Sequence, residues 1–181
     1  EHHVHVANGR AAEAREQLAQ LYQLTRGAQA EMRILLLELR PDALVETGLG
    51  DLLEQLAQAT SSRAMLPVSV NITGACVPPL DVKVALYRIA QEALNNVVKH
   101  ADAAHVTLSL CCDEDAITLQ IGDDGCGFDP DNVPRERLGQ RSMNERAAAI
   151  GAHLVVTSAI GQGTTVTCMW PTAAPDDHAL S

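Results

Sequence analysis

Two hydrophobic periodicities alternate along residues 48–171, and their order leaves few possible folds. Apolar residues recur every three or four positions in three segments, which predicts helices. The helical segments are 48–60, 78–100 and 141–150. Apolar and polar residues alternate in five other segments, which predicts strands. The strand segments are 68–73, 105–111, 116–121, 153–158 and 164–170. This order predicts an α+β fold, a two-layer α/β sandwich with a mixed five-stranded sheet.

A further long helix is predicted ahead of this domain, over residues 11–41 (the stalk helix). Its apolar residues are spaced three and four apart, which is a heptad seam and implies a partner helix. Arg40 and Pro41 end the helix, because a residue before proline is driven out of helical dihedral angles. We expect a dimerisation helix over 11–41, a globular domain over 48–171, and loose tails over 1–10 and 172–181. The alternative is a helix packed on its own domain.

Charge and cysteine content argue against several classes of function. The chain has 13 basic and 23 acidic residues, a formal net charge of -10, and no basic run, so we expect no direct contact with nucleic acid. No apolar stretch approaches the roughly 18 residues of a membrane span, so we expect no membrane contact in this part of the protein. The cysteine content favours a cytoplasmic location, and the parent protein is expected to be either membrane-anchored or soluble. The five cysteines are odd in number and form no CxxC pair. Their spacing indicates neither a zinc knuckle nor a disulfide framework.

The helix predicted over 78–100 carries a polar stripe along one face. Glu92, Asn96, Lys99 and His100 are four, three and one residues apart, so they lie together on the helix surface. A carboxylate, an amide oxygen and a cation in one stripe suit Mg²⁺ and phosphate groups, since Mg²⁺ takes one or two protein oxygens and keeps most of its waters. A solvated polar face is an equally good interpretation of this helix alone.

Two glycine-rich turns follow predicted strands. In the first, Asp123 is placed at the mouth of the sheet, where its carboxylate could accept a hydrogen bond from an exocyclic amine such as that of adenine. Gly125 and Gly127 would let backbone come close to a ligand. The alternative is a simple tight turn, because Asp-Gly pairs are common turn formers. The second turn contains Gly161, Gly163 and Thr164 and by itself is typical of a routine hairpin.

In order, these segments resemble the motifs of sensor histidine kinases. RIAQEALNNVVKHA (88–101) is similar to the N box, DDGCGF (123–128) to the first glycine box, and GQGTTV (161–166) to the closing glycine–threonine motif. LELRP (37–41) and MNERAAAIGAHLVVTS (143–158) resemble the NarX/DesK-type subfamily. The resemblance implies the ATP-binding catalytic domain of that family, with the Bergerat-type ATPase fold shared by GHKL proteins.

The resemblance also implies a role for each matching residue. Asn96 would bind Mg²⁺ through ATP, and Glu92, the catalytic candidate, would position metal-bound water or phosphate. Lys99 and His100 would face the phosphates. Asp123 would bind the adenine amine, Thr164 would support the adenine end, and the remaining ATP-binding residues would be glycines. These are Gly125, Gly127, Gly139, Gly161 and Gly163, with Gly139 marking a second glycine box at the edge of a flexible lid over 129–142. Gln140 and Ser142 depart from the family's pattern there.

The phosphoacceptor histidine of the subfamily, which is followed by an acidic residue, has no match in this sequence. None of the seven histidines precedes Asp or Glu. The resemblance therefore implies ATP and Mg²⁺ as cofactors, a homodimer through the stalk helix, and a response regulator with a LuxR-type DNA-binding domain, but no autophosphorylation by this chain alone. Two alternatives stay open: a nucleotide-binding interaction module without turnover, and another ATPase or an anti-sigma kinase of the same fold.

Overall fold

The computed structural model describes residues 47–129 and 138–172. The predicted stalk helix over 11–41, the tail over 1–10, and nearly all of the tail over 172–181 lie outside the described residues. So does most of the predicted lid, residues 130–137. Within the described residues, no helix is both long enough and apolar enough to cross a membrane.

Three helices and five strands make up the described domain. In chain order they are α3 (Leu49–Ala64), β1 (Val68–Thr73), α4 (Leu80–His100), β2 (Val106–Cys112), β3 (Ala116–Asp123), α5 (Leu138–Ala149), β4 (His153–Ser158) and β5 (Thr164–Pro171). The sheet order is β1-β2-β3-β5-β4, in which β1 is parallel to β2 and the other neighbours are antiparallel. The predicted mixed five-stranded sheet is confirmed.

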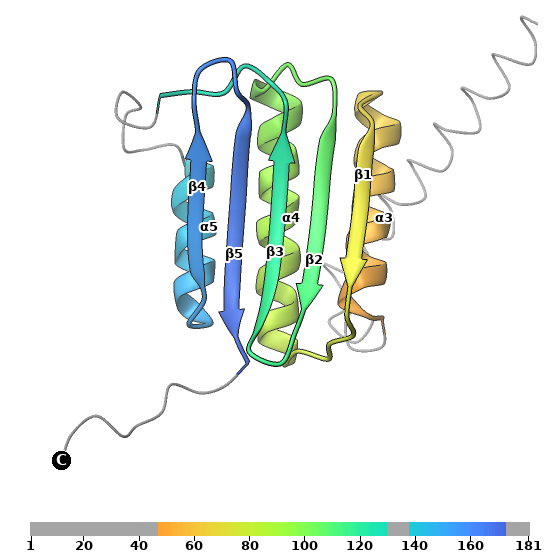
Figure 1. Cartoon of the computed structure of the whole chain (residues 1–181), viewed down its shortest axis with the longest axis vertical. Helices are drawn as coiled ribbons and strands as arrows, with labels where there is room; N and C mark the ends of the chain where they lie inside the picture. The colour runs from red at the N-terminus through yellow and green to blue at the C-terminus, as the bar shows by residue number, and fades with distance from the viewer. Residues whose placement is uncertain (1–46, 130–137, 173–181) are drawn as a thin grey trace, which may run out of the picture.

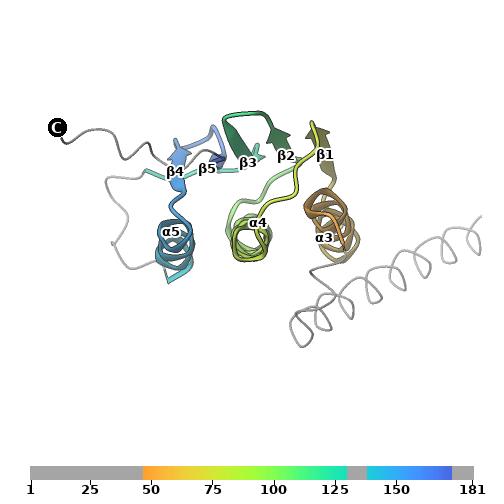
Figure 2. The same ribbon diagram turned by 90° about the horizontal axis from the view of Figure 1, so that it is seen from below.

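The helices form one layer against one face of the sheet, as the view along the strands shows (Figure 2). α4 lies across the middle of the sheet, between α3 and α5 (Figure 1). Its apolar side fits against inward-facing strand residues such as Leu108 and Leu119, both fully buried. Only 2% of the chain is aromatic, so this interface is almost entirely aliphatic, as the composition predicts. Burial of aliphatic surface is the main favourable contribution to the stability of such a core.

Two helix boundaries differ from the prediction. α3 continues past Thr60 to Ala64 and ends at Met65, which adopts a left-handed conformation with φ of 54°. α5 begins at Leu138 instead of about Arg141, so Gly139 lies in the first turn of this helix and not in a loop. The apolar positions Met143 and Ala147 identified the body of α5, but nothing apolar marks its first turn beyond Leu138. Helix ends are set by local backbone contacts that periodicity does not reveal.

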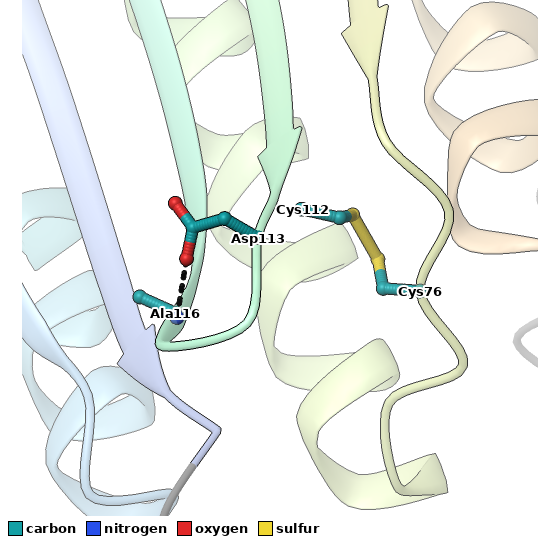
Figure 3. The surroundings of a disulfide bond; sticks show 4 residues. All are labelled: Cys76, Cys112, Asp113 and Ala116. Carbon is teal, nitrogen blue, oxygen red and sulfur yellow. Dashed lines mark hydrogen bonds between the residues drawn. A yellow bond between two sulfur atoms is a disulfide. The ribbon is translucent and has the colours of Figure 1, made fainter.

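A disulfide joins Cys76, which follows β1, to Cys112 at the end of β2 (Figure 3). The expectation drawn from cysteine spacing was wrong for this pair. Parallel pairing places Thr73 opposite Cys111, so the ends of β1 and β2 are adjacent although the two bonded cysteines are 36 residues apart in sequence. Their Cα atoms are 5.7 Å apart, a usual separation for a disulfide. Short sequence motifs do not reveal contacts between residues that are so far apart in the chain.

Replacing Cys76 with serine is expected to lower the free energy of unfolding by about 2–4 kcal/mol, because the disulfide restricts the unfolded chain. Chemical denaturation of the non-reduced protein measures the change. Cys111→Ser is the matched control, since Cys111 is exposed and free, and is expected to change stability by less than about 0.5 kcal/mol. Equal stability of the Cys76→Ser variant and the non-reduced parent would show that the bond does not form in solution.

Candidate functional site

A cleft of about 620 Å³ opens at the end of the sheet where β3 ends. The disulfide lies at the opposite end, because the last residue of β3, Asp123, pairs with the first residue of β2, whereas Cys112 is the last residue of β2. The walls of the cleft are the last three turns of α4, the end of β3 with the turn that follows it, and the first residues of β5. Met143 of α5 and Val156 of β4 close the apolar side. Segments far apart in the sequence therefore meet at one place.

The polar stripe of α4 lines this cleft. Glu92 and Asn96 are half-buried, while Lys99 and His100 near the end of the helix are exposed. The stripe adjoins Ala93 and Val97, whose buried side chains hold this part of α4 in the core. The alternative for this helix was a solvated polar face. All four residues lie on a concave surface instead, which does not fit that alternative.

Asp123 and Thr164 line the cleft opposite α4. They end β3 and begin β5, where they are register partners across the sheet. Oδ1 of Asp123 accepts a hydrogen bond from the backbone amide of Gly125 at 2.9 Å, and no other hydrogen bond to this carboxylate is found among residues 47–129 and 138–172. The carboxylate is half-buried and therefore offers hydrogen-bond acceptors at the edge of the cleft.

Three predicted glycines are required by the protein's own backbone. A β-carbon at Gly125 would overlap the carbonyl oxygen of Ala101, and one at Gly127 would overlap that of Ala159. One at Gly163 would overlap the carbonyl oxygen of Asp123, and φ at this residue is +74°, which L-residues rarely adopt. Close approach between the turns thus explains these glycines without reference to a ligand, a reason that the sequence did not indicate.

Backbone hydrogen bonds fasten the first glycine turn to its neighbours. The amide of Cys126 donates to the carbonyl of Ala101 after α4, at 2.7 Å, and the amide of Gly161 donates to the carbonyl of Cys126, also at 2.7 Å. The turn therefore links the end of α4 to the β4–β5 turn. These bonds fix the distance between the polar stripe and Asp123.

Asp124 does not line the cleft, and its side chain ties the same turn to the α4–β2 loop. Its Oδ1 accepts hydrogen bonds from the amides of Ala104 and His105, each at 2.8 Å. The bond from His105 holds the pKa of this carboxyl below its usual value. The ionised form is the one stabilised by folding, so the stabilisation is present above the unfolded-state pKa and is lost as pH falls through the folded-state pKa.

Residues 81–174 match the family described as histidine kinase-, DNA gyrase B-, and HSP90-like ATPase. The matched segment contains α4 from its second residue onward and every residue of the cleft. The chain belongs to this ATPase family. Membership implies ATP as the nucleotide.

Relatives of this ATPase-family chain include sensor proteins. It is 32% identical to the sensor protein VraS of Staphylococcus haemolyticus over 163 residues, which is 90% of this chain and 47% of that protein. It is also 32% identical to VraS of Staphylococcus saprophyticus over 164 residues, 91% of this chain and 47% of that protein. The chain thus spans about half the length of these curated relatives.

Two solved structures share the ATPase-family fold. The histidine kinase domain of the blue-light activated histidine kinase from Erythrobacter litoralis EL346 aligns with a TM-score of 0.61 and 25% identity, covering 82% of this chain and 74% of that one. Full-length ShkA in complex with AMPPNP aligns with a TM-score of 0.59 and 22% identity, covering 71% of this chain and 31% of that one, and shows the fold alone.

The cleft gathers most of the predicted site residues, but not all. Those that line it are Glu92, Asn96, Lys99, His100, Asp123, Gly127 and Thr164. Gly125, Gly161 and Gly163 shape the adjoining turns without lining it, and Gly139 lies in the first turn of α5.

The apolar wall of the cleft was not among the features predicted from the sequence. Ile121, Met143, Val156 and Val166 form this wall. Three of them belong to predicted strands and Met143 to a predicted helix, but the strand and helix patterns did not indicate that they meet at one edge of the sheet. Together they form an apolar surface suited to a flat ligand.

Proposed function

We propose that this chain is the ATP-binding catalytic part of a two-component sensor histidine kinase. In the parent protein it transfers the γ-phosphoryl group of ATP to a histidine that is absent from this sequence, and from there the group passes to an aspartate of a response regulator. The main support for this proposal is that the α4 stripe and the Asp123 turn line the same cleft. A nucleotide site needs one group of residues for the adenine and another for the phosphates, close enough for one ligand to contact both. Positioning and charge stabilisation dominate phosphoryl transfer.

The adenine end lies at Asp123 and Thr164. The Asp123 carboxylate accepts a hydrogen bond from the exocyclic amine, and Thr164 supports the same edge of the base. The wall formed by Ile121, Met143 and Val166 supplies the apolar surface on which a base lies. Gly127 and the neighbouring turn glycines hold this end in shape.

The phosphate end lies along α4. Glu92 and Asn96 contribute half-buried oxygens, which fit one or two ligand positions of Mg²⁺. No cluster of three or more metal-ligating His, Cys, Asp or Glu residues occurs in the described ranges, so the metal would be held mainly by ATP and water. Mg²⁺ would neutralise the charge that develops on the phosphates. Lys99 and His100 attract the phosphates, and Glu92 orients metal-bound water or phosphate.

The wider organisation is proposed from the sequence motifs. The stalk helix over 11–41 pairs with a second copy, the catalytic domain spans 48–171, and residues 1–10 and 172–181 are tails. LELRP (37–41) and the stretch 143–158 favour the NarX/DesK-type subfamily. Its partner would be a response regulator with a LuxR-type DNA-binding domain, and this part of the kinase would act in the cytoplasm.

Incubation with γ-labelled ATP tests the enzymatic part of the proposal. This chain alone is expected to acquire no acid-labile phosphoryl group, because none of its histidines has the acidic neighbour of the phosphoacceptor. A separate helical segment carrying that histidine is expected to become labelled when mixed with it. Labelling of the chain alone would contradict the absence of a phosphoacceptor.

The changed second glycine box favours one other function. Gln140 and Ser142 replace the family's usual residues, which favours a nucleotide-binding interaction module without turnover. In the labelling experiment, ATP binding without transfer to the added histidine segment would support this second function and contradict the first.

Cysteine labelling tests the nucleotide site independently of catalysis. Cys126 is exposed and lines the cleft, whereas Cys111 is exposed at the far end of the sheet. Saturating Mg²⁺-ATP is expected to slow alkylation of Cys126 at least about tenfold and to leave Cys111 unchanged, as mass spectrometry would measure. Cys168 should stay unlabelled in both cases, because burial raises the pKa of its thiol to about 11. Equal rates at Cys126 with and without ATP would contradict the placement of ATP in this cleft.

A further inference from the structure

Ser158, the last residue of β4, lies at the centre of a hydroxyl network behind the cleft. Its Oγ lies 2.9 Å from the amide nitrogen of Phe128, 2.9 Å from the carbonyl oxygen of Gly163 and 3.0 Å from Oγ1 of Thr164. Phe128 and Thr164 line the cleft, whereas Ser158 does not. One half-buried side chain thus contacts both glycine-rich turns and a cleft residue.

The proton arrangement in this network follows from the partners. A serine hydroxyl has one hydrogen to donate and two lone pairs to accept with. The amide of Phe128 only donates, and the carbonyl of Gly163 only accepts. The single hydrogen of Ser158 is therefore used on Gly163, and the bond between the two hydroxyls must use the hydrogen of Thr164.

Thr164 is consequently left with only lone pairs to offer the cleft. Its register partner Asp123 also offers acceptors there. The two side chains therefore make this edge of the cleft a hydrogen-bond acceptor surface. A base with an amine at this edge finds two acceptors. A base with a carbonyl in the same place puts a third acceptor against these two. None of the three oxygens then has a hydrogen to accept, and they are left unpaired when the base covers them.

We propose that Ser158 is a positioning residue for nucleotide selectivity: by fixing the hydroxyl hydrogen of Thr164, it makes the cleft prefer 6-aminopurine over 6-oxopurine nucleotides. This inference rests on the proposed function, because it requires the base to lie at Asp123 and Thr164. Without Ser158, the Thr164 hydroxyl is free to rotate and donate its hydrogen to a 6-oxo group.

The test compares ATP with inosine triphosphate, which carries an oxo group in place of the 6-amine and a hydrogen on N1. Each variant is compared with the parent for both nucleotides, so the difference at N1 is the same in every comparison. Calorimetric titration of the full chain in Mg²⁺ gives a dissociation constant for each. Ser158→Ala is expected to lower the preference for ATP over inosine triphosphate by about tenfold, the value of the one hydrogen bond that the 6-oxo group gains from the freed Thr164 hydroxyl. Ser158→Thr keeps the hydroxyl and is expected to restore the preference.

A purely structural role for Ser158 predicts a different result, namely that Ser158→Ala weakens both nucleotides by the same factor and leaves the preference unchanged. That outcome overturns the proposal. Thr157→Ala is the matched control: Thr157 is the preceding residue of β4 and is exposed on the opposite face of the sheet, so its loss should alter neither constant.

Thr164→Val provides a second test that leaves the bonds of Ser158 to Phe128 and Gly163 in place, and it applies even if Ser158→Ala does not fold. It is expected to lower the same preference about tenfold, and an unchanged preference would overturn the proposal. Failure of the proposed function gives a different result from failure of the inference about Ser158, because the parent protein would then bind neither nucleotide. Binding of ATP by the parent with an unchanged preference in both variants would overturn the inference about Ser158 alone.

Discussion

Replacing Asp123 with asparagine is expected to weaken ATP binding by about 10- to 100-fold. The carboxylate offers acceptors at the cleft, and its Oδ1 is already bonded to the amide of Gly125. An asparagine that keeps this bond turns its NH₂ group toward the base, so an amine would face an amine. A hydrogen bond to a charged group contributes about 1.5–3 kcal/mol, which corresponds to this range of affinities. Isothermal titration of the full chain with Mg²⁺-ATP measures the change.

The neighbouring residue provides a matched control. Asp124→Asn makes the same chemical change one position along the chain, where the side chain points to the amides of Ala104 and His105. Both of these bonds go to one oxygen, which asparagine retains. We expect ATP affinity within about threefold of the parent, a change below about 1 kcal/mol. Equal losses at Asp123 and Asp124 would show that charge in general, and not the position of Asp123, determines binding.

Replacing Gly125 with alanine is expected to abolish measurable ATP binding and to destabilise the domain by about 3 kcal/mol or more. The new β-carbon would overlap the carbonyl oxygen and side chain of Ala101 at the end of α4. Relief of this overlap must move the turn away from α4, which breaks the bond between the Cys126 amide and that carbonyl. Asp123 and the polar stripe would then no longer face one ligand. Thermal unfolding and titration with ATP measure the two effects.

Gly122 allows the same substitution three residues earlier without such an overlap. A β-carbon there would meet only Oγ1 of Thr165, at 3.4 Å, so Gly122→Ala is expected to cost less than about 1 kcal/mol and to keep ATP binding. A Gly125→Ala variant as stable as Gly122→Ala would contradict the close contact between the turn and α4.

The sequence predicted the elements of the fold because each has a local pattern. Alternation in β3 and β5 and the helical period of α4 are visible within ten to twenty residues of chain. The order of strands is not local in this sense. The insertion of β5 between β3 and β4, and the parallel pairing of β1 with β2, depend on packing between distant segments. For the same reason, the contact between Cys76 and Cys112 could not be inferred from cysteine spacing.

The polar residues that line the cleft could be picked out from the sequence, whereas the contacts that support the cleft could not. Glu92, Asn96 and Asp123 belong to compact motifs whose residue types indicate their chemistry. Ser158 belongs to an ordinary alternating strand, and only its three hydrogen-bond partners, 5 to 30 residues away, distinguish it from its neighbours. The glycines were recognised as significant, but the carbonyl groups that exclude a side chain from them lie on other segments. Both features depend on tertiary contacts between distant segments, and a short stretch of sequence does not show such contacts.

A titration with ATP followed by backbone amide NMR determines whether α4 and the Asp123 turn together form one nucleotide cleft. We expect the amide signals of Asn96 to His100, Asp123 to Phe128 and Thr164 to shift together and to yield one dissociation constant, while those of β1 stay unchanged. Shifts confined to α4 or to the Asp123 turn alone, or two unrelated dissociation constants, would contradict it.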